Sequence, residues 1–553
     1  MKFKYSWLPF ILLGLTACDV NNDLDPIVAA EEEVIAVNAN GVDFSNYIAV
    51  GASFTAGFTD NALFIAAQEN SFPNILSQKF ALAGGGTFTQ PLMNDNIGGL
   101  LFGGTQIQGP RLFFDGSGPA SLATLGAVPT TDAANPVTGD INNYGMPGAK
   151  SFHFVAPGYG SAAGLIATPR TANPYFVRVA SSATTTVLAD AVAKNPTFFT
   201  LSEFGGNDVL GYALSGGESD MTAPNYNPIT PTATFDAVFA TTLGALTGTG
   251  AKGVVGNVPY ITSLAHFTTV PYNPLDPRGD SDAATQLAAQ IPLLNNVYGA
   301  INQVYAGAGQ AERSIVFATD APNALVIYDE DAFDLTMAIT NTLAASPTFV
   351  PFVESLGLPA AAAPLVAQLL GQQYGKARSA TANDLFVLPS SSVIGTVNTT
   401  AATALVTQSG GLLPATLAGQ FSAEGITLPL ADKWVLTPQE QEELRIATDA
   451  YNTTIETAVN ADPNLALVDL KGLLEEAASD TGVQFDDFIF NGNLVTGGLV
   501  SLDGVHLTAK GYALMANRIL EAIDGAFGSN FKDATNGLAK ANNYPTNYSP
   551  FLR

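Results

Sequence analysis

Residues that can activate a serine hydroxyl lie near the two ends of the chain. Ser53 follows the apolar run YIAVG within a cluster of small residues, and Asp503 precedes His506 by three positions in SLDGVHLTAKGY. A histidine can take the proton of a serine hydroxyl, and a carboxylate bonded to the imidazole fixes its tautomer and stabilises its charged form. Together these residues predict nucleophilic catalysis, provided that the fold brings them to one place.

Each of these residues also has a plainer role open to it. A serine in a turn commonly bonds nearby backbone groups. Asp503 can cap a turn and His506 can begin a helix, as capping preferences allow. Taken one at a time, the residues do not decide between the two interpretations.

Two further segments offer hydrogen-bond donors to a developing oxyanion. In LSEFGGNDVLGYAL a strand ends at Gly-Gly, and the amide of Asn207 can donate from the following turn. In INNYGMPGAKS, Gly145 and Gly148 lie in a turn whose backbone N–H groups can serve the same oxyanion. The alternative for the first segment is a Gly-Gly turn in which Asn207 or Asp208 caps the next helix.

In chain order, these blocks resemble those of the SGNH, or GDSL-type, family of serine esterases and lipases. VGASFTAG is similar to the Gly-Asp-Ser-Leu element, NYGMPGA to Asn-x-Gly-x-x-Gly, GGND to Gly-x-Asn-Asp, and DGVH to Asp-x-x-His. Ala52 stands where the family usually has aspartate, and Phe54 where it often has leucine. The resemblance covers chiefly residues 45–260 and 435–528.

The resemblance implies a role for each matched residue. Ser53 is the nucleophile it implies, His506 the base and Asp503 the carboxylate that orients the base. The oxyanion hole it implies consists of the N–H groups of Ser53 and Gly145 and the side-chain amide of Asn207. The implied reaction is hydrolysis of carboxylic esters of lipids or acylated glycans through an acyl-enzyme, with no metal and no organic cofactor.

Two other functions stay open. A non-catalytic surface lipoprotein that binds lipid or glycan on the same fold is suggested by Ala52 and by the large insertions. A carbohydrate acetylesterase would prefer short acyl groups, whereas an apolar insertion can shelter a longer acyl chain. His153 and His266 have no Cys or carboxylate at ligand spacing, so we interpret both as structural.

The elements that must position these residues indicate an α/β protein. Apolar runs bounded by Gly, Asn or Pro predict strands at YIAVG, TFFTLSEFG, KGVVGNVP and LALVDL, with helical patterns between them. A long helix is predicted after Thr437, because Pro438 suits its first position and Glu440 completes a capping box. One face of that helix is apolar: Leu444, Ala447, Tyr451 and Ile455. We expect a three-layer α/β/α sandwich with a mostly parallel sheet and large insertions, and catalytic loops at the carboxyl ends of the strands.

The same patterns divide the chain into segments. They predict a lipoprotein signal peptide at 1–18, an acidic flexible tether at 19–44, a hydrolase core at 45–260 and 435–528, an insertion at about 84–137, a helical insertion and candidate lid at 261–434, and a C-terminal tail at 529–553.

The segment MKFKYSWLPFILLGLTAC has two lysines and an apolar stretch too short to span a bilayer, and it ends in a sequence that resembles a bacterial lipobox. Cys18 is the only cysteine, and lipidation accounts for a thiol without a partner. A cleaved signal peptide with an incidental cysteine is the alternative. We expect export to the bacterial cell envelope and a lipid anchor in the outer membrane, facing the periplasm or the surface.

Composition excludes some partners. The 553 residues carry a formal net charge of -27, which repels phosphate backbones, so nucleic-acid binding is not expected. Charged residues make up 12% and apolar residues 47%, a balance that supports a large folded core. The expected partners are an ester substrate and a membrane reached through the anchor. The sequence does not indicate the oligomeric state.

Overall fold

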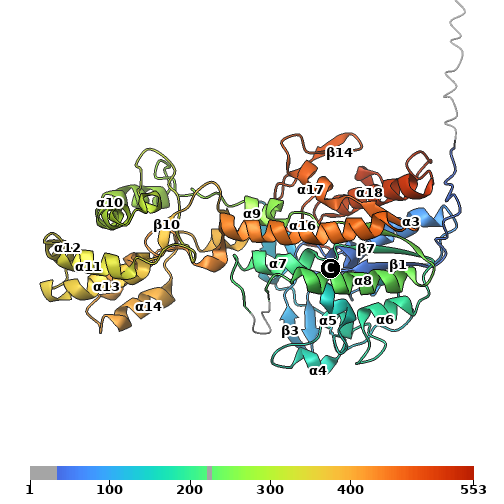
Figure 1. Ribbon diagram of the computed structural model, residues 1–553, viewed down its shortest axis with the longest axis horizontal. Coiled ribbons are helices and arrows are strands. Elements are labelled where there is room, and N and C mark those ends of the chain that lie inside the picture. The colour runs from blue at the N-terminus through green and yellow to red at the C-terminus, as the bar shows by residue number, and fades with distance from the viewer. Residues whose placement is uncertain (1–33, 221–226) are drawn as a thin grey trace, which may run out of the picture. The chain divides into compact units, whose positions relative to one another are not determined.

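The computed structural model describes residues 34–220 and 227–553 (Figure 1). The predicted signal peptide and Cys18 therefore lie outside the described residues, as does most of the predicted tether.

A five-stranded sheet lies at the centre of the fold, in the order β13-β8-β7-β1-β6. Its strands are β1 (Tyr47–Gly51), β6 (Asn143–Gly145), β7 (Phe198–Ser202), β8 (Lys252–Gly256) and β13 (Leu465–Val468). Every neighbouring pair is parallel. The strands are buried on both faces, which explains why their sequences are continuous apolar runs rather than alternating ones. Four of the five strands are predicted from the sequence.

Successive residues of one strand enter two different hydrophobic cores. Ile48 and Val50 of β1 pack in a core with α8 (Thr232–Thr247) and α16 (Pro438–Asn460). Tyr47 and Ala49 pack in another core, with α3 (Phe72–Ala81) and α18 (Ala509–Phe527). Helices therefore cover both faces of the sheet, as Figure 1 shows, and the predicted α/β/α sandwich is confirmed.

The N-terminus of α16 has the predicted cap. The Thr437 hydroxyl accepts from the Glu440 N–H, and the Glu440 carboxylate accepts from the Thr437 N–H at 2.6 Å. The predicted apolar face, which includes Leu444 and Tyr451, is buried. Local sequence signals therefore set the position of this helix.

Helices of 6 to 26 residues occupy much of the segment between β8 and β13. They are α10 (Asp282–Gly307), α11 (Thr336–Ala345), α12 (Phe349–Ser355), α13 (Ala363–Tyr374), α14 (Thr399–Gln408) and α15 (Ala415–Gln420). Apolar side chains such as Tyr298, Ile339 and Ala367 form a core of their own there. The sequence predicts a helical insertion here, and its role as a lid stays a prediction.

Among the described residues, no single helix is long and apolar enough to cross a membrane. The helices at Phe349–Ser355 and Ala360–Tyr374 reach that length and hydropathy as a pair, but they bend by 116°. Val353 and Ala367 of this pair are fully buried in the helical core.

The earlier insertion forms two hairpins. One pairs β2 (Leu100–Phe102) with β3 (Thr105–Gln108), and the other pairs β4 (Leu112–Phe114) with β5 (Pro119–Ser121). Arg111, at the start of the second hairpin, is fully buried. Its guanidinium donates to the carbonyl oxygens of Ser549 (2.7 Å) and Leu552 (3.1 Å).

Both ends of the described chain pack more firmly than the predicted boundaries imply. The predicted tether runs to residue 44, but Val42 and Phe44 are buried in the core that contains α3 and α18. In the predicted C-terminal tail, Phe531 is fully buried in the same core and Tyr548 packs on Phe64. The polar composition of these two segments obscures the few apolar side chains that anchor them, so the folded body begins before residue 45 and includes part of the C-terminal tail.

Candidate active site

Ser53 lies at a sharp turn between a strand and a short helix. The strand β1 ends at Gly51, and the helix α1 (Ser53–Ala56) begins two residues later. A Cβ added to Gly51 would lie 2.6 Å from the carbonyl oxygen of Ser202 and would overlap the Thr55 hydroxyl, so this close turn requires glycine. The turn places Ser53 at the carboxyl end of a central strand.

Asp503 and His506 form the predicted pair. The Nδ1 atom of His506 is 2.9 Å from Oδ2 of Asp503, while Oδ1 accepts the N–H groups of Val505 (2.9 Å) and His506 (2.8 Å). Burial opposes ionisation of this carboxyl, but His506 and the N–H donors hold the pKa of Asp503 well below its usual range. Asp503 is therefore a carboxylate, which accepts a hydrogen bond from Nδ1–H and leaves Nε2 of His506 free to act as a base.

The fold joins the Ser53 turn to the Asp503–His506 pair. The Asn61 N–H, eight residues after Ser53, donates to Oδ2 of Asp503 at 2.8 Å. The His506 ring contacts two aromatic rings next to Ser53, with centroid distances of 5.7 Å to Phe54 and 4.6 Å to Phe58. Residues more than 400 positions apart in the sequence thus meet at one end of the sheet.

The predicted asparagine lies just after β7, which ends at Ser202. Gly205, at a φ of 109°, is the N-cap of α7 (Gly206–Leu214), and Asn207 lies in the first turn of that helix. Its Nδ2 donates to the Ala149 carbonyl oxygen at 2.9 Å, and both Asn207 and Ser53 line the same pocket. Gly205 occupies the N-cap without a side-chain cap, so Asn207 is not the helix cap.

The predicted role of Gly145 does not fit the structure. Its N–H donates to Oδ1 of Asn143 at 2.9 Å, so this donor is already occupied. A Cβ at Gly145 would overlap the backbone of Ala56, which explains why glycine is needed there for packing. Gly148, three residues later, is exposed with a φ of 78°, and no acceptor among the described residues takes its N–H. Gly148 is therefore the available donor of this turn.

Sequence reasoning missed Glu203, which lies beneath the Ser53 turn. Its carboxylate accepts the Thr55 N–H at 3.0 Å, the Ser202 hydroxyl at 2.8 Å, and the backbone N–H of Ala52. Ala52 occupies the place of the family's aspartate, and Glu203 supplies a carboxylate to the same turn from the neighbouring strand end. The motif gave no signal for it, because the contact depends on the pairing of β1 with β7.

We expect Glu203→Gln to change how stability depends on pH. Burial raises the pKa of Glu203 to about 7 from its ordinary 4.5, so the folded state holds a proton that the unfolded state releases. The contribution of Glu203 to the free energy of unfolding is full below pH 4.5 and is lost as the pH rises through 7. Relative to wild type, the variant should gain up to about 3 kcal/mol in the free energy of unfolding across this range.

Denaturant unfolding of both proteins between pH 4 and pH 8 measures this difference. Other buried carboxyls titrate in both proteins and cancel in the comparison. A difference that stays constant with pH would contradict the assignment.

The pocket next to Ser53 is strongly apolar. Its lining includes six large apolar side chains from α7, α17 (Leu470–Ala478) and α18: Leu210, Leu470, Leu473, Leu474, Leu514 and Met515. The cavity has a volume of about 100 Å³, whereas a single water needs roughly 10–15 Å³ on the same measure. The cavity is therefore larger than the hydrolytic water alone requires, and its lining suits an apolar group attached to the reacting carbonyl.

The two remaining histidines have different surroundings. His153 stacks on Tyr159 at 4.5 Å, and burial, with Lys150 nearby, lowers its pKa to about 4. His266 donates its backbone N–H to the Gly504 carbonyl oxygen at 2.9 Å, so it supports the loop that carries Asp503. Both contacts agree with structural roles.

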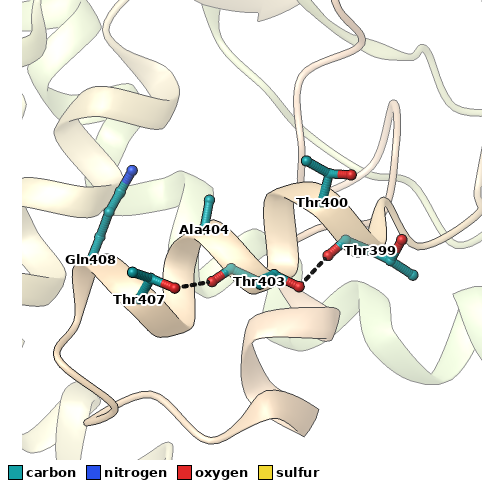
Figure 2. Close-up of a pocket in the computed structure, with 6 residues that line it drawn as sticks. All are labelled: Thr399, Thr400, Thr403, Ala404, Thr407 and Gln408. Carbon is teal, nitrogen blue, oxygen red and sulfur yellow. Dashed lines mark hydrogen bonds between the residues drawn. The ribbon is translucent and has the colours of Figure 1, made fainter.

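A second hollow, on α14, has no comparable chemistry. Figure 2 shows that its lining consists of threonines, an alanine and a glutamine along one helix. The Thr403 and Thr407 hydroxyls donate back to the carbonyl oxygens of Thr399 (2.7 Å) and Thr403 (2.9 Å). These hydroxyls stay bound to their own helix, and no base or acid lines the hollow.

A parallel α/β/α sandwich with a serine and an Asp–His pair at its strand ends defines the class of serine hydrolases of the esterase and lipase type. A family model, GDSL-like Lipase/Acylhydrolase, matches residues 355–519, which supports a GDSL-type hydrolase domain in this part of the chain. The matched range contains Asp503 and His506, whereas Ser53 and Asn207 lie outside it. No curated protein and no solved structure matches the chain.

Proposed function

We propose that this chain hydrolyses carboxylic esters through an acyl-enzyme on Ser53. One observation carries the proposal: the Asp503–His506 pair is tied to the segment that follows Ser53 by the 2.8 Å hydrogen bond from the Asn61 N–H to Asp503. Ser53 lines the same pocket as Val505 and Leu507, the two residues on either side of His506. A purely structural Asp–His pair does not explain why a serine at a strand end lies there.

The proposed reaction has two halves. His506 Nε2 takes the Ser53 proton while Oγ attacks the ester carbonyl carbon, and the imidazolium then protonates the departing alkoxide. Water attacks the acyl-enzyme in the second half, with His506 again as the base, and releases the acid. Asp503 holds the imidazole in the required tautomer throughout and stays ionised.

Three donors are proposed for the oxyanion. They are the N–H groups of Ser53 and Gly148 and the second Nδ2 hydrogen of Asn207, whose first hydrogen is held by Ala149. The buried Asp208 carboxylate holds the segment that follows Gly148 next to α7, because it accepts the Ser151 N–H at 2.8 Å and the Ser151 hydroxyl at 2.7 Å. Fixed donors of this kind stabilise developing charge without reorganising during the reaction.

Asn207→Ala should lower kcat for ester hydrolysis by about 10²- to 10³-fold, because it removes one oxyanion donor. KM should change little, since the donor acts mainly on the transition state. Steady-state kinetics on p-nitrophenyl butyrate measure both constants. A variant with unchanged kcat would remove Asn207 from the oxyanion hole.

For the acyl group we propose a chain longer than acetate. The six leucine and methionine side chains beside Ser53 offer apolar burial, worth roughly 0.8 kcal/mol per CH₂ that leaves water. Hydrolysis of p-nitrophenyl esters from acetate to palmitate by the full chain tests this preference. A maximum of kcat/KM beyond acetate supports an esterase or lipase for lipid esters, whereas a maximum at acetate favours a carbohydrate acetylesterase.

We further propose that Cys18 carries a lipid that anchors the protein in the bacterial outer membrane. The segment 261–434 is proposed as a lid, because its first residues, Ile261 and Leu264, line the Ser53 pocket.

The lipobox-like sequence supports the lipid anchor at Cys18. Cell fractionation of the Cys18→Ala variant tests the anchor. Protein that stays in the membrane fraction to the same extent would refute it.

A further inference from the structure

Three carboxylates meet outside the Ser53 pocket, whose lining includes none of them. Glu330, Asp432 and Glu440 each present an oxygen within 4.8 Å of the other two. Glu330 follows β9 (Val326–Tyr328), Asp432 precedes β12 (Val435–Leu436), and Glu440 lies in the first turn of α16. Segments separated by more than 100 residues thus converge on one acidic cluster.

Two of these carboxylates are buried with oxygens that accept from no N–H or hydroxyl group. Asp432 is 6% exposed, and the only side-chain hydrogen-bond partner of its buried carboxyl among the described residues is another acid, Glu330. Glu440 is 2% exposed; its Oε2 is bound by Thr437, but its Oε1 has no partner. An unpaired buried carboxylate is costly, so a fold that places three such oxygens together requires a positive charge or bound protons.

The basic side chains nearby point elsewhere. Within residues 34–220 and 227–553, no lysine or arginine forms an ion pair with any of the three acids. Lys433 lies over the Trp434 ring at 5.0 Å, and Lys376 donates to the backbone oxygen of Glu330 at 2.6 Å. The repulsion within the cluster is therefore not relieved by a lysine or arginine side chain among the described residues.

A glycine turn that follows α7 packs against the acidic cluster. Gly216 and Gly217 follow α7, the helix that carries Asn207, and both have positive φ, at 64° and 86°. A Cβ on Gly217 would overlap Oε1 of Glu440, so only glycine lets this turn approach the carboxylate so closely. The cluster therefore lies where α7, α16 and the inserted helical segment meet.

We propose that Glu330, Asp432 and Glu440 bind a divalent cation with a preference for oxygen ligands, Ca²⁺ or Mg²⁺. An all-carboxylate donor set suits these hard cations and does not suit zinc or copper, which favour histidine and cysteine. Glu330, which is exposed, leaves room for water to complete the coordination. The ion takes no part in ester hydrolysis, for which no metal is expected; it ties the inserted segment to α7 and α16.

Calorimetric titration of the full chain, first treated with EDTA, tests the proposal with CaCl₂ and with MgCl₂ at pH 7.5. We expect saturable binding of one ion per chain and a higher Tm with the preferred ion. Glu330→Gln should weaken binding on the order of 10-fold or more, because it removes one charged ligand. Glu330 is exposed, so this variant should fold normally, and the exposed Asp487→Asn serves as the matched control with unchanged binding.

Asp432→Asn separates the ion from a merely structural role. Without metal, this variant should have a higher Tm than wild type, because it removes repulsion from the cluster. With the preferred ion, wild type should gain Tm while the variant gains little. If neither salt binds to wild type, or if the Glu330→Gln and Asp432→Asn variants bind as tightly as wild type, the proposal is wrong and shared protons neutralise the cluster.

Discussion

Ser53→Ala should reduce kcat for ester hydrolysis on the order of 10⁶-fold, down to the level that binding and the oxyanion donors support alone. The substitution removes the only oxygen proposed to attack the ester, and the small alanine side chain fits the turn after Gly51. Stopped assays on p-nitrophenyl butyrate, with the full chain of wild type and variant, give the ratio.

Ser45→Ala is the matched control for this measurement. Ser45 is exposed two residues before β1, so its loss should leave activity unchanged. Retention of more than a tenth of the activity by folded Ser53→Ala would exclude Ser53 as the nucleophile. If wild type hydrolyses no ester of the series, a lipid- or glycan-binding lipoprotein becomes the better account.

Asp503→Asn should lower kcat on the order of 10⁴-fold. The Oδ2 position now accepts from His506 Nδ1 and from the Asn61 N–H. An amide nitrogen placed there would donate to Nδ1 and would leave the Asn61 N–H without its acceptor. The imidazole would then carry its proton on Nε2, where it cannot accept the Ser53 proton. Steady-state kinetics between pH 5 and pH 9 measure the loss.

The same substitution also disturbs the loop, so its stability must be measured in parallel. The Val505 and His506 N–H groups can still bond to the remaining carbonyl oxygen, and we expect a folded variant. Asp487→Asn, on an exposed loop, controls for the loss of one negative charge. Near wild-type kcat in folded Asp503→Asn would contradict the tautomer argument.

The sequence predicted the parts of the fold that depend on local signals. The Thr437–Glu440 capping box and the apolar runs at β1, β7, β8 and β13 correspond to observed elements. The strand β6 escaped prediction, because Asn143–Gly145 is three residues long and becomes a strand only by pairing with β1.

The candidate site divides in the same way. The positions of Ser53, Asn207, Asp503 and His506 follow from short motifs, and the structure brings them to one pocket or its border. The choice between Gly145 and Gly148 depends on which N–H the Asn143 side chain occupies. The orientation of the Asn143 side chain is set by tertiary packing, because its Nδ2 donates to the Thr55 carbonyl oxygen at 2.8 Å. Tertiary packing also places Glu203 next to the Ser53 turn, and no spacing in the sequence encodes either contact.

The most direct test of the account is covalent labelling of the full chain with a fluorophosphonate, followed by peptide mass spectrometry. The nucleophile's oxygen forms a bond to phosphorus and fluoride leaves, which marks an activated serine. We predict a single adduct on the peptide that contains Ser53, and no adduct in Ser53→Ala or His506→Ala. An adduct on another serine, or none on folded and ester-hydrolysing wild type, would contradict Ser53 as the catalytic nucleophile.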